Sequence, residues 1–292
     1  MRVLLLAAGL GTRLRPLTLR MPKPLVRIVD RSILEHQALL ARTLPGATLH
    51  VNAHYLAEDL ARAADALGFE KVWTETPEPL GTGGPLFRMN GEDPVDELLV
   101  MNSDCFCRFD LRSFVRLARS SGAPCALLAV ENPLVNSLYV RNGFLSGIRD
   151  RFGDRTRERV TFSGISWYSK RALGEIRESE SDVRLFWKRL FESGHAPFVD
   201  CSQKFSLWID MGTPDGLMRA SDFRRKELGV GNFGVPKGLM ANAKATVFMP
   251  GTEVPPTATF DHAVVFPGAR IDDGECVKNE IRGEDFRWVI GR

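Results

Sequence analysis

The sequence predicts an α/β fold in which a doubly wound, mostly parallel mixed sheet is followed by a short C-terminal segment of another kind. Three observations lead to this prediction. Short apolar runs alternate with amphipathic helical patterns in the first half, glycine-rich turns follow several of the runs, and a six-residue apolar period appears near the end. Continuous apolar runs are typical of parallel strands covered by helices on both faces, and such strands connect through right-handed crossovers.

The first half of the chain carries the strand–helix alternation. Ser32 and Glu35 form a capping box for a helix that ends near residue 42, and Asp110 is placed to cap a helix over residues 111–120. A further helix is expected at residues 58–67. The strands are expected at residues 3–8, 48–52, 71–75, 97–101 and 125–130.

The second half changes to an α+β pattern that we expect to complete the same sheet. Thr213-Pro214-Asp215 opens a helix that runs to about Glu227. Two more helices are expected at residues 170–177 and 183–192. Short strands are expected at residues 138–140, 144–148, 161–168 and 205–209.

Composition and charge exclude several classes of protein. The 292 residues carry 39 basic and 36 acidic side chains, a net charge of +3 that is too balanced for nucleic acid or an anionic membrane as the main partner. The five cysteines form no CxxC pair, so a disulfide framework is not expected, and Cys105 and Cys107 are interpreted as small buried hydrophobic residues. No apolar run reaches the ~20 residues that span a bilayer. We therefore expect a cytoplasmic protein.

A glycine-bearing loop follows the first expected strand. Residues 6–18 read LAAGLGTRLRPLT, and Pro-Lys-Pro follows at residues 22–24. Bare backbone amides in such a loop can wrap phosphates, and Arg13 and Lys23 add positive charge. A dinucleotide-binding fingerprint does not fit, because Leu14 stands where its third glycine is needed, and the Gly-Lys-Ser/Thr ending of a P-loop is missing.

The complete string of Gly-x-Gly-Thr-Arg, Pro-x-Thr and Pro-Lys-Pro resembles the signature of the sugar-1-phosphate nucleotidyltransferases. The resemblance continues in PLGTGG at residues 79–84, in Asn-Ser-Asp at residues 102–104 and in WIDMGTP at residues 208–214. It covers about residues 1–228 and implies a Rossmann-like nucleotidyltransferase fold for that part of the chain.

The resemblance also implies a reaction and a set of site residues. A phosphate oxygen of a sugar 1-phosphate would attack the α-phosphorus of a nucleoside triphosphate (NTP) and displace pyrophosphate. Glycines in the second loop are expected to clear space for the base. Catalysis is assigned to Arg13, Lys23, Asp104 and Asp210, with Mg²⁺ held by Asp104 and Asp210. Nucleotide binding is assigned to Leu6, Ala7, Ala8, Gly9, Gly11, Thr12, Arg13, Gly81, Thr82 and Gly83.

The expected sugar site departs from the family pattern. Many members carry a Glu-Lys-Pro string whose lysine holds the sugar phosphate, whereas residues 148–151 here read Ile-Arg-Asp-Arg. Either Arg149 or Arg151 replaces that lysine, or the phosphate is held in another way. The residues expected to contact the sugar phosphate are Lys23, Gly147, Arg149 and Gly164.

The substrates are predicted from finer similarities within the family. PLGTGG, Glu-Asn-Pro at residues 131–133 and TFSGIS at residues 161–166 resemble the uridylyltransferases that act on N-acetylmuramate 1-phosphate. UTP with an amino-sugar 1-phosphate is therefore the predicted pair. A mannose-1-phosphate guanylyltransferase that uses GTP and a regulatory homologue without turnover are the alternatives, although the signature cations and both aspartates argue against the second.

The C-terminal segment has its own apolar pattern. Val265, Ile271 and Val277 recur every six residues, which is typical of a left-handed β-helix. About two coils fit, fewer than a stable stack needs, so we expect the segment to pack on the catalytic domain or to form a homo-oligomer with a second copy. The predicted divisions are a nucleotidyltransferase domain at residues 1–228, a linker at residues 229–243 and the β-helix-like segment at residues 244–292.

Overall fold

The computed structural model describes residues 1–153 and 158–291 of the chain. The chain divides into two compact units, each built from separate stretches of sequence. The first contains Met1–Gly9, Gln37–Ser103 and Cys107–Trp208, and the second contains Leu10–His36, Asp104–Phe106 and the chain from Ile209 onward. The predicted domain divisions at residues 1–228, 229–243 and 244–292 stay a prediction, and Arg292 lies outside the described residues.

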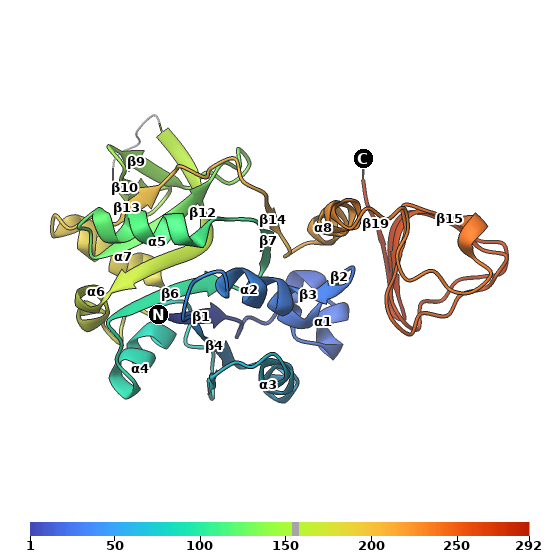
Figure 1. Ribbon diagram of the computed structural model, residues 1–292, viewed down its shortest axis with the longest axis horizontal. Coiled ribbons are helices and arrows are strands. Elements are labelled where there is room, and N and C mark those ends of the chain that lie inside the picture. The colour runs from blue at the N-terminus through green and yellow to red at the C-terminus, as the bar shows by residue number, and fades with distance from the viewer. Residues whose placement is uncertain (154–157, 292) are drawn as a thin grey trace. The chain divides into compact units, whose positions relative to one another are not determined.

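Among the described residues, the first unit is built on a ten-stranded sheet, in which β1, β6 and β12 lie side by side (Figure 1). The strand order is β11-β10-β13-β8-β12-β6-β1-β4-β5, and β9 pairs with both β10 and β12. The strands are β1 (Arg2–Leu6), β4 (Thr48–Ala53), β5 (Lys71–Thr74), β6 (Glu97–Asn102), β8 (Cys125–Val130), β9 (Leu138–Arg141), β10 (Phe144–Ile148), β11 (Phe152–Gly153), β12 (Glu158–Ser169) and β13 (Phe198–Asp200).

The apolar run at the N-terminus forms the predicted strand, with a fully buried centre, although the strand ends at Leu6 and not at residue 8. Val3, Leu4 and Leu5 expose none of their surface, and β1 runs parallel to both β4 and β6. In this register Leu6 lies opposite Asn52 on one side and Asn102 on the other. Because the carboxyl ends of parallel strands meet at one edge of a sheet, the residues that follow these strands are brought together there.

The sheet is mixed, as predicted, but most strand pairs in its second half are antiparallel, although β13 runs parallel to β8. Strand β12 runs antiparallel to β6 and β8, and β10 runs antiparallel to β9, β11 and β13. For β9 and β10 the reason lies in their connection, since a tight turn can join only antiparallel strands. Asn142 and Gly143, both with positive φ, form such a turn between β9 and β10, which is the Asn-Gly signal of a hairpin.

Helices pack beside the sheet of the first unit, and their predicted caps are present. Ser32 Oγ accepts from the Glu35 amide at 3.2 Å, while Glu35 Oε2 accepts from the Ser32 amide at 2.6 Å, which completes the capping box. Asp110 accepts from the Ser113 amide at 3.0 Å. None of the helices in the described parts of the chain is both long and apolar enough to cross a membrane. These helices are α2 (Ile33–Ala41), which starts in the second unit, α3 (Ala57–Ala66), α4 (Gly84–Glu92), α5 (Leu111–Ser120), α6 (Lys170–Glu175) and α7 (Val183–Glu192).

The second unit begins with the signature loop and ends with the C-terminal strands. Thr213 caps its longest helix, because its hydroxyl accepts from the Gly216 amide at 3.1 Å. The strand predicted at residues 205–209 starts later, since Phe205 lies in a turn and is 81% exposed. The elements before the C-terminal strands are η1 (Thr12–Leu14), α1 (Leu17–Arg20), η2 (Lys23–Leu25), β2 (Arg27–Ile28), β3 (Arg31–Ser32), β7 (Cys105–Cys107), β14 (Trp208–Asp210), α8 (Pro214–Glu227) and η3 (Met240–Asn242).

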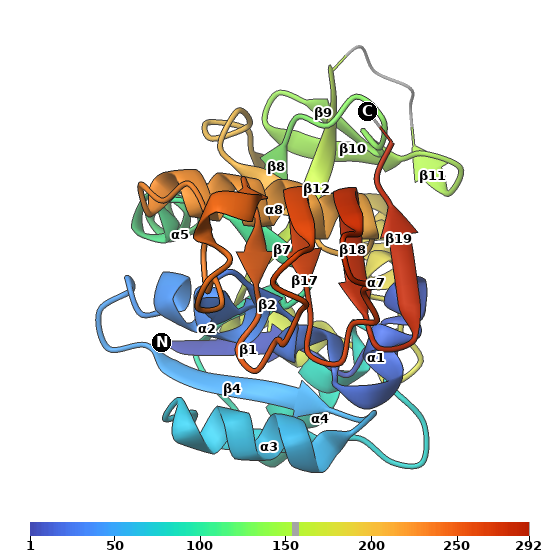
Figure 2. The ribbon, with the colours of Figure 1, turned by 90° about the vertical axis from the view of Figure 1, so that its right-hand side faces the viewer.

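The C-terminal strands stack in parallel at intervals of 17 residues (Figure 2). Ala243 pairs with Phe260, which pairs with Val277. This interval is close to three of the predicted six-residue periods. The last strand instead runs antiparallel to its neighbour, so the left-handed β-helix stays a prediction. The strands are β15 (Ala243–Lys244), β16 (Val247–Phe248), β17 (Thr259–Val265), β18 (Cys276–Gly283) and β19 (Phe286–Val289).

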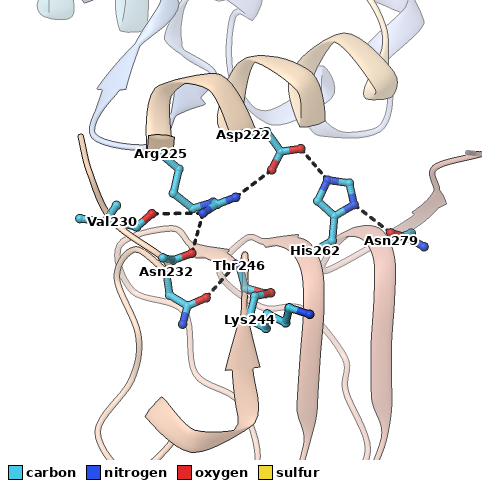
Figure 3. Close-up of polar contacts among 9 residues, drawn as sticks. Asp222, Arg225, Val230, Asn232, Lys244, Thr246, His262 and Asn279 are labelled. Carbon is cyan, nitrogen blue, oxygen red and sulfur yellow. Dashed lines mark hydrogen bonds and ion pairs between the residues drawn. The ribbon is translucent and has the colours of Figure 1, made fainter. Parts of the chain in front are cut away.

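A polar network joins α8 to these strands (Figure 3). His262 Nε2 lies 2.6 Å from Asp222 Oδ2, and His262 Nδ1 lies 2.8 Å from Asn279 Oδ1. Arg225 pairs with Asp222 at 3.4 Å and donates to the Val230 carbonyl at 3.1 Å. Burial lowers the pKa of His262, but the hydrogen bonds to Asn279 and Asp222 and the charge of Asp222 outweigh it, so the pKa lies above its ordinary value.

Candidate active site

A buried polar chain connects the end of β1 to the second glycine loop within the first unit. The Ala7 amide donates to Asn52 Oδ1 at 2.5 Å, and Asn52 Nδ2 donates to Glu75 Oε1 at 2.7 Å. The other oxygen of Glu75 accepts from the Leu80 amide at 2.7 Å. Asn52 and Glu75 are each 1% exposed. Sequence reasoning missed both, although each is a polar residue at the end of an apolar strand, the same signal that marks Asp104.

The second glycine loop packs against the backbone that leads into α7. The amides of Thr82 and Gly83 both donate to the Ser181 carbonyl at 2.8 Å. A Cβ at Gly81 would come within 2.5 Å of that carbonyl oxygen, and one at Gly83 within 2.0 Å of the Glu180 carbonyl oxygen. The glycines are therefore required by backbone packing, and the expectation that their missing Cβ atoms also clear space for a base stays a prediction. Nucleotide binding by Gly81, Thr82 and Gly83 stays a prediction.

The signature loop turns sharply at Gly11, the first of its predicted residues in the second unit. Gly11 has a φ of 61°, in the left-handed region that favours glycine, and its carbonyl accepts from the Thr18 hydroxyl at 2.8 Å. A Cβ there would lie 3.1 Å from the Cβ of Lys23. The chain therefore changes direction at Gly11, before Thr12 and Arg13, and the Lys23 side chain packs against Gly11. In the first unit, Leu6, Ala7, Ala8 and Gly9 lead into this loop.

The structure brings the four predicted catalytic residues together in two pairs within the second unit. Arg13 Nη1 lies 3.1 Å from Asp210 Oδ2, and Lys23 Nζ lies 3.3 Å from Asp104 Oδ2. The Met211 amide donates to the Asp104 carbonyl at 2.9 Å, which places the two aspartate-bearing loops side by side. Lys23 is buried, whereas Arg13, Asp104 and Asp210 are partly exposed. The arrangement combines two cations that can bind phosphate with two carboxylates that can bind a cation.

Asp210 is held at the end of β14 by local contacts. Its Oδ1 accepts from the Gly212 amide at 2.7 Å. A Cβ at Gly212 would overlap the Arg13 guanidinium, at 2.0 Å from Nη2, so Arg13 would have to shift if this residue were not glycine. Likewise, a Cβ at Gly216 would lie 1.9 Å from the Asp210 carbonyl oxygen. These glycines therefore allow the Arg13–Asp210 pair to form.

The predicted metal site has two protein carboxylates. The described residues contain no cluster of three or more His, Cys, Asp or Glu side chains that could hold a metal ion. Cys105 and Cys107 are buried free thiols of β7, as interpreted from the sequence. Two carboxylates fit Mg²⁺, because this ion keeps several waters and takes further oxygens from substrate phosphates. They do not fit a metal that needs a complete protein cage.

A pocket of about 430 Å³ lies in the first unit. Its wall includes the aromatic side chains of Phe162, Tyr168 and Trp187, with Trp187 Nε1 donating to the Tyr168 hydroxyl at 3.2 Å. Of the predicted site residues, Leu6, Thr82 and Arg149 line it. Its polar lining is completed by Asn102, Ser137, Asp150, Arg151, Thr161, Ser166, Asp182 and Arg184. Apolar walls with a few polar groups are typical of a small-molecule site.

Three arginines and two aspartates line this pocket, which leaves one positive charge in excess. Arg151 Nη1 and Arg184 Nη2 both pair with Asp182 Oδ2, at 3.1 and 2.7 Å. Arg149 Nε lies 3.9 Å from Asp150 Oδ2, a longer contact. Burial raises the pKa of Asp182, but the hydrogen bonds from Arg184 and the charges of Arg184 and Arg151 lower it below its usual range. The pocket therefore presents positive charge suited to an anionic ligand.

Gly147 and Gly164, predicted to contact the sugar phosphate, have a structural reason for being glycine. A Cβ at Gly147 would lie 2.6 Å from the Phe152 carbonyl oxygen, where β10 meets β11. Gly164 has a φ of 88°, and a Cβ there would lie 2.9 Å from the Asn102 Cβ. Both glycines thus shape neighbouring strands of the pocket wall. Their contact with a sugar phosphate stays a prediction.

With this geometry in place, the comparison with known proteins can be reported. Residues 2–136 match the family described as nucleotidyl transferase. Two solved structures share the fold. HddC from Yersinia pseudotuberculosis has a TM-score of 0.58 at 21% identity, covering 76% of this chain and 99% of that chain. A putative glucose-1-phosphate thymidylyltransferase from Bacillus anthracis has a TM-score of 0.63 at 17% identity, covering 77% and 95%. At these identities the likeness establishes the α/β nucleotidyltransferase fold with its mixed sheet.

The curated relatives are more specific. The catalytic subunit beta of mannose-1-phosphate guanylyltransferase from Drosophila pseudoobscura pseudoobscura is 29% identical over 228 residues, 74% of this chain and 60% of that protein. The Danio rerio subunit is 31% identical over 235 residues, 75% and 63%. Mannose-1-phosphate guanyltransferase 2 of Candida glabrata is 32% identical over 231 residues, 75% and 63%. The chain thus spans about 60% of the length of the curated relatives it matches.

Proposed function

We propose that this chain transfers a nucleoside monophosphate from a nucleoside triphosphate to a sugar 1-phosphate and releases pyrophosphate. The observation that carries the proposal is the set of two ion pairs in the second unit, Arg13 with Asp210 and Lys23 with Asp104. A regulatory homologue without turnover would have no need to keep both cations and both carboxylates in contact. The family match of residues 2–136 and the names of the curated relatives support the same reaction class.

For the substrates, GTP with mannose 1-phosphate becomes the leading candidate. The curated relatives at 29% to 32% identity carry this activity in their names. The predicted pair of UTP with an amino-sugar 1-phosphate becomes the second candidate, supported by the TFSGIS string at residues 161–166. The excess positive charge of the pocket in the first unit suits any sugar 1-phosphate, so it favours neither candidate.

The proposed mechanism is a direct in-line displacement. Catalysis then consists of positioning the reactants and neutralising their charge, and it needs no serine, cysteine or histidine nucleophile. The Arg13 guanidinium can fork onto oxygens of the leaving pyrophosphate. The Lys23 ammonium, a compact charge, is assigned to the α-phosphate or to the attacking phosphate. The pocket of the first unit is assigned to the sugar, with Arg149 as the candidate for its phosphate.

Asp104 and Asp210 are the residues that would hold Mg²⁺. When bound, the ion would orient the phosphates and neutralise their negative charge. The two carboxylates are engaged by Arg13 and Lys23 in this structure.

A matrix of four nucleoside triphosphates against a panel of sugar 1-phosphates tests the proposed function. Pyrophosphate release is the readout, with Mg²⁺ present, and the panel includes mannose 1-phosphate and N-acetylated and carboxylated amino-sugar 1-phosphates. We expect release with GTP and mannose 1-phosphate. A clear preference for UTP with an amino-sugar 1-phosphate would replace this assignment. Absence of pyrophosphate with every pair would favour the regulatory alternative.

We further propose that the C-terminal strands are coils of a left-handed β-helix-like segment. The 17-residue parallel register supports this proposal. A homo-oligomer formed through the segment and a cytoplasmic location stay predictions.

A further inference from the structure

Residues 181–183, which lead into α7, contact both the second glycine loop and the charged residues that line the pocket. On one side, the Ser181 carbonyl accepts from the amides of Thr82 and Gly83, and the Val183 amide donates to the Thr82 hydroxyl at 3.0 Å. On the other side, Asp182 reaches Arg151 across the pocket. Residues 181–183 therefore connect two parts of the first unit that are distant in sequence.

The segment is anchored at its start by a buried carboxylate. Glu180 is 6% exposed, and its oxygens accept from Arg189 Nε at 2.8 Å and from the Arg177 amide at 2.9 Å. This anchor ties one end of the segment to α7. The opposite tie runs through Asp182 to Arg151, which lies in the turn between β10 and β11.

Asp182 does more than cap its helix. As the N-cap of α7, its Oδ1 accepts from the Arg184 amide at 3.0 Å, while Oδ2 pairs with Arg151 and with the Arg184 side chain. Asp110, the N-cap of α5, accepts from its helix amide at the same 3.0 Å, and it lies outside the pocket. Asp110 and Asp182 thus share the capping role, but Asp182 in addition pairs with Arg151, an arginine of the pocket.

The three arginines of the pocket differ in how closely they contact a carboxylate. Arg151 and Arg184 both face the carboxylate of Asp182, and each is within 3.1 Å of it. Arg149 makes a longer contact, with its Nε 3.9 Å from Asp150 Oδ2. An incoming phosphate competes least with existing ion pairs at Arg149, because it need not displace a short contact.

We propose that Asp182 is a positioning residue that couples the second glycine loop to the sugar pocket by holding Arg151, while Arg149 binds the sugar phosphate. The inference rests on the proposed function for its ligands, but the coupling itself is a property of the free protein. Loss of the Asp182–Arg151 pair releases residues 181–183 at one end. The Ser181 carbonyl then holds the glycine loop less firmly, and Arg151 no longer shapes the rim beside Arg149.

The test uses the full-length chain with Asp182→Asn, because asparagine also caps helices well but carries no charge for Arg151. Arg151→Met removes the same pair from the other side, and Asp110→Asn is the matched control at the cap of α5. Hydrogen exchange of the Thr82 and Gly83 amides is measured without ligand. We expect exchange to rise about tenfold in both Asp182→Asn and Arg151→Met, and to stay at the wild-type rate in Asp110→Asn. Unchanged exchange in the first two variants overturns the coupling.

Steady-state kinetics with the best pair from the substrate matrix provide the second readout. We expect Asp182→Asn to raise KM for both the nucleotide and the sugar 1-phosphate by about tenfold, with a smaller effect on kcat. Asp182→Asn combined with Arg151→Met should cost little more than either change alone, because both remove one interaction. Arg149→Met should raise KM for the sugar 1-phosphate alone.

The two readouts keep this inference apart from the proposed function. Faster exchange in a protein that turns over no substrate pair would support the coupling and contradict the proposed function. A rise in KM with unchanged exchange, or fully additive effects of Asp182→Asn and Arg151→Met, would contradict the coupling while the reaction stands.

Discussion

Asp210 shows how one side chain can serve both the local fold and the expected chemistry. One oxygen accepts from the Gly212 amide, and the other lies 3.1 Å from Arg13 Nη1. The first contact needs only an acceptor, whereas the second contact and the binding of Mg²⁺ need negative charge. An amide in place of the carboxylate therefore separates the two functions.

We expect Asp210→Asn to reduce turnover by on the order of a hundredfold or more while the fold persists, because charge at the phosphates is lost and the local hydrogen bond can remain. The measurement is pyrophosphate release as a function of Mg²⁺ concentration, with circular dichroism as the check on folding. Asp215→Asn is the matched control, since Asp215 is a half-exposed carboxylate in the first turn of α8. Near-normal turnover in Asp210→Asn would remove Asp210 from the metal site.

At the scale of elements, the C-terminal strands share a bend at equivalent positions. Ala245, His262 and Asn279 are 17 residues apart and have φ values of 51°, 57° and 52°. Asparagine and histidine are enriched in this left-handed region, whereas alanine has no side-chain polar group to favour it. Ala245 is therefore the strained member of the series.

Replacing Ala245 by glycine should raise the free energy of unfolding by about 1 kcal/mol, because glycine reaches positive φ without a steric penalty. Ala243 is the matched control. It lies two residues earlier with a φ of −121°, so Ala243→Gly should lower stability instead. Thermal melts of both variants give the comparison. Destabilisation of the same size in both would show that the bend at Ala245 carries no strain.

The contact between α8 and β17 should make stability depend on pH through His262. Its pKa is raised in the folded protein, so the stabilisation is fully present below the ordinary value of about 6.5 and is lost as pH rises through the folded-state pKa. Asp222, Asn279 and Arg225 are the polar groups that face it.

We expect His262→Asn to remove this dependence, because asparagine tolerates the positive φ but carries no titrating charge. The wild-type chain should lose about 1 kcal/mol relative to the variant between pH 6 and pH 9, measured as a difference in urea unfolding. Parallel pH profiles for the two proteins would exclude His262 as the titrating group.

At the scale of the whole molecule, the C-terminal segment is tied to the rest of the second unit at several points. Arg20 of α1 pairs with Glu284 and Asp285, and Asp222 of α8 binds His262. Val264, Val265, Phe266 and Ile271 are the residues of this segment that we expect to need a partner, and within the single chain the first three are buried and Ile271 is partly buried. Their burial therefore requires no second copy of the protein.

Deleting residues 244–292 should lower the melting temperature by about 5 °C or more, because α1 and α8 lose these contacts. The remaining enzyme should keep its order of preference among substrates, since the described pocket lies in the first unit. Differential scanning calorimetry and the substrate matrix together measure both outcomes. A truncated protein that melts like the full chain and loses only sugar binding would place the tail in the active site.

Much of the local structure could be predicted because short-range rules determine it. The apolar run before Gly9, the capping box at Ser32 and the cap at Asp110 each depend on residues within one turn or strand. The catalytic assignments of Arg13 and Asp210 came from complete strings, and the structure places the two side chains in contact. Asn52 and Glu75 were not predicted, because a single polar residue at the end of a strand is common and neither residue lies within a recognisable sequence motif.

The sequence alone indicated most of the strands and helices of the first unit, the caps at Ser32, Asp110 and Thr213, and the four charged residues of the second unit, whereas α4 and β13 were not predicted. Only the tertiary structure decided that β12 runs antiparallel to β6 and β8, that Gly81 packs on Ser181 and that Asp182 meets Arg151. The physical reason is the distance along the chain. Periodicity and capping act over a few residues, whereas loop-closure entropy changes slowly with loop length and so scarcely distinguishes one distant partner from another. Packing and backbone hydrogen bonding make that choice, and they exist only in the folded chain.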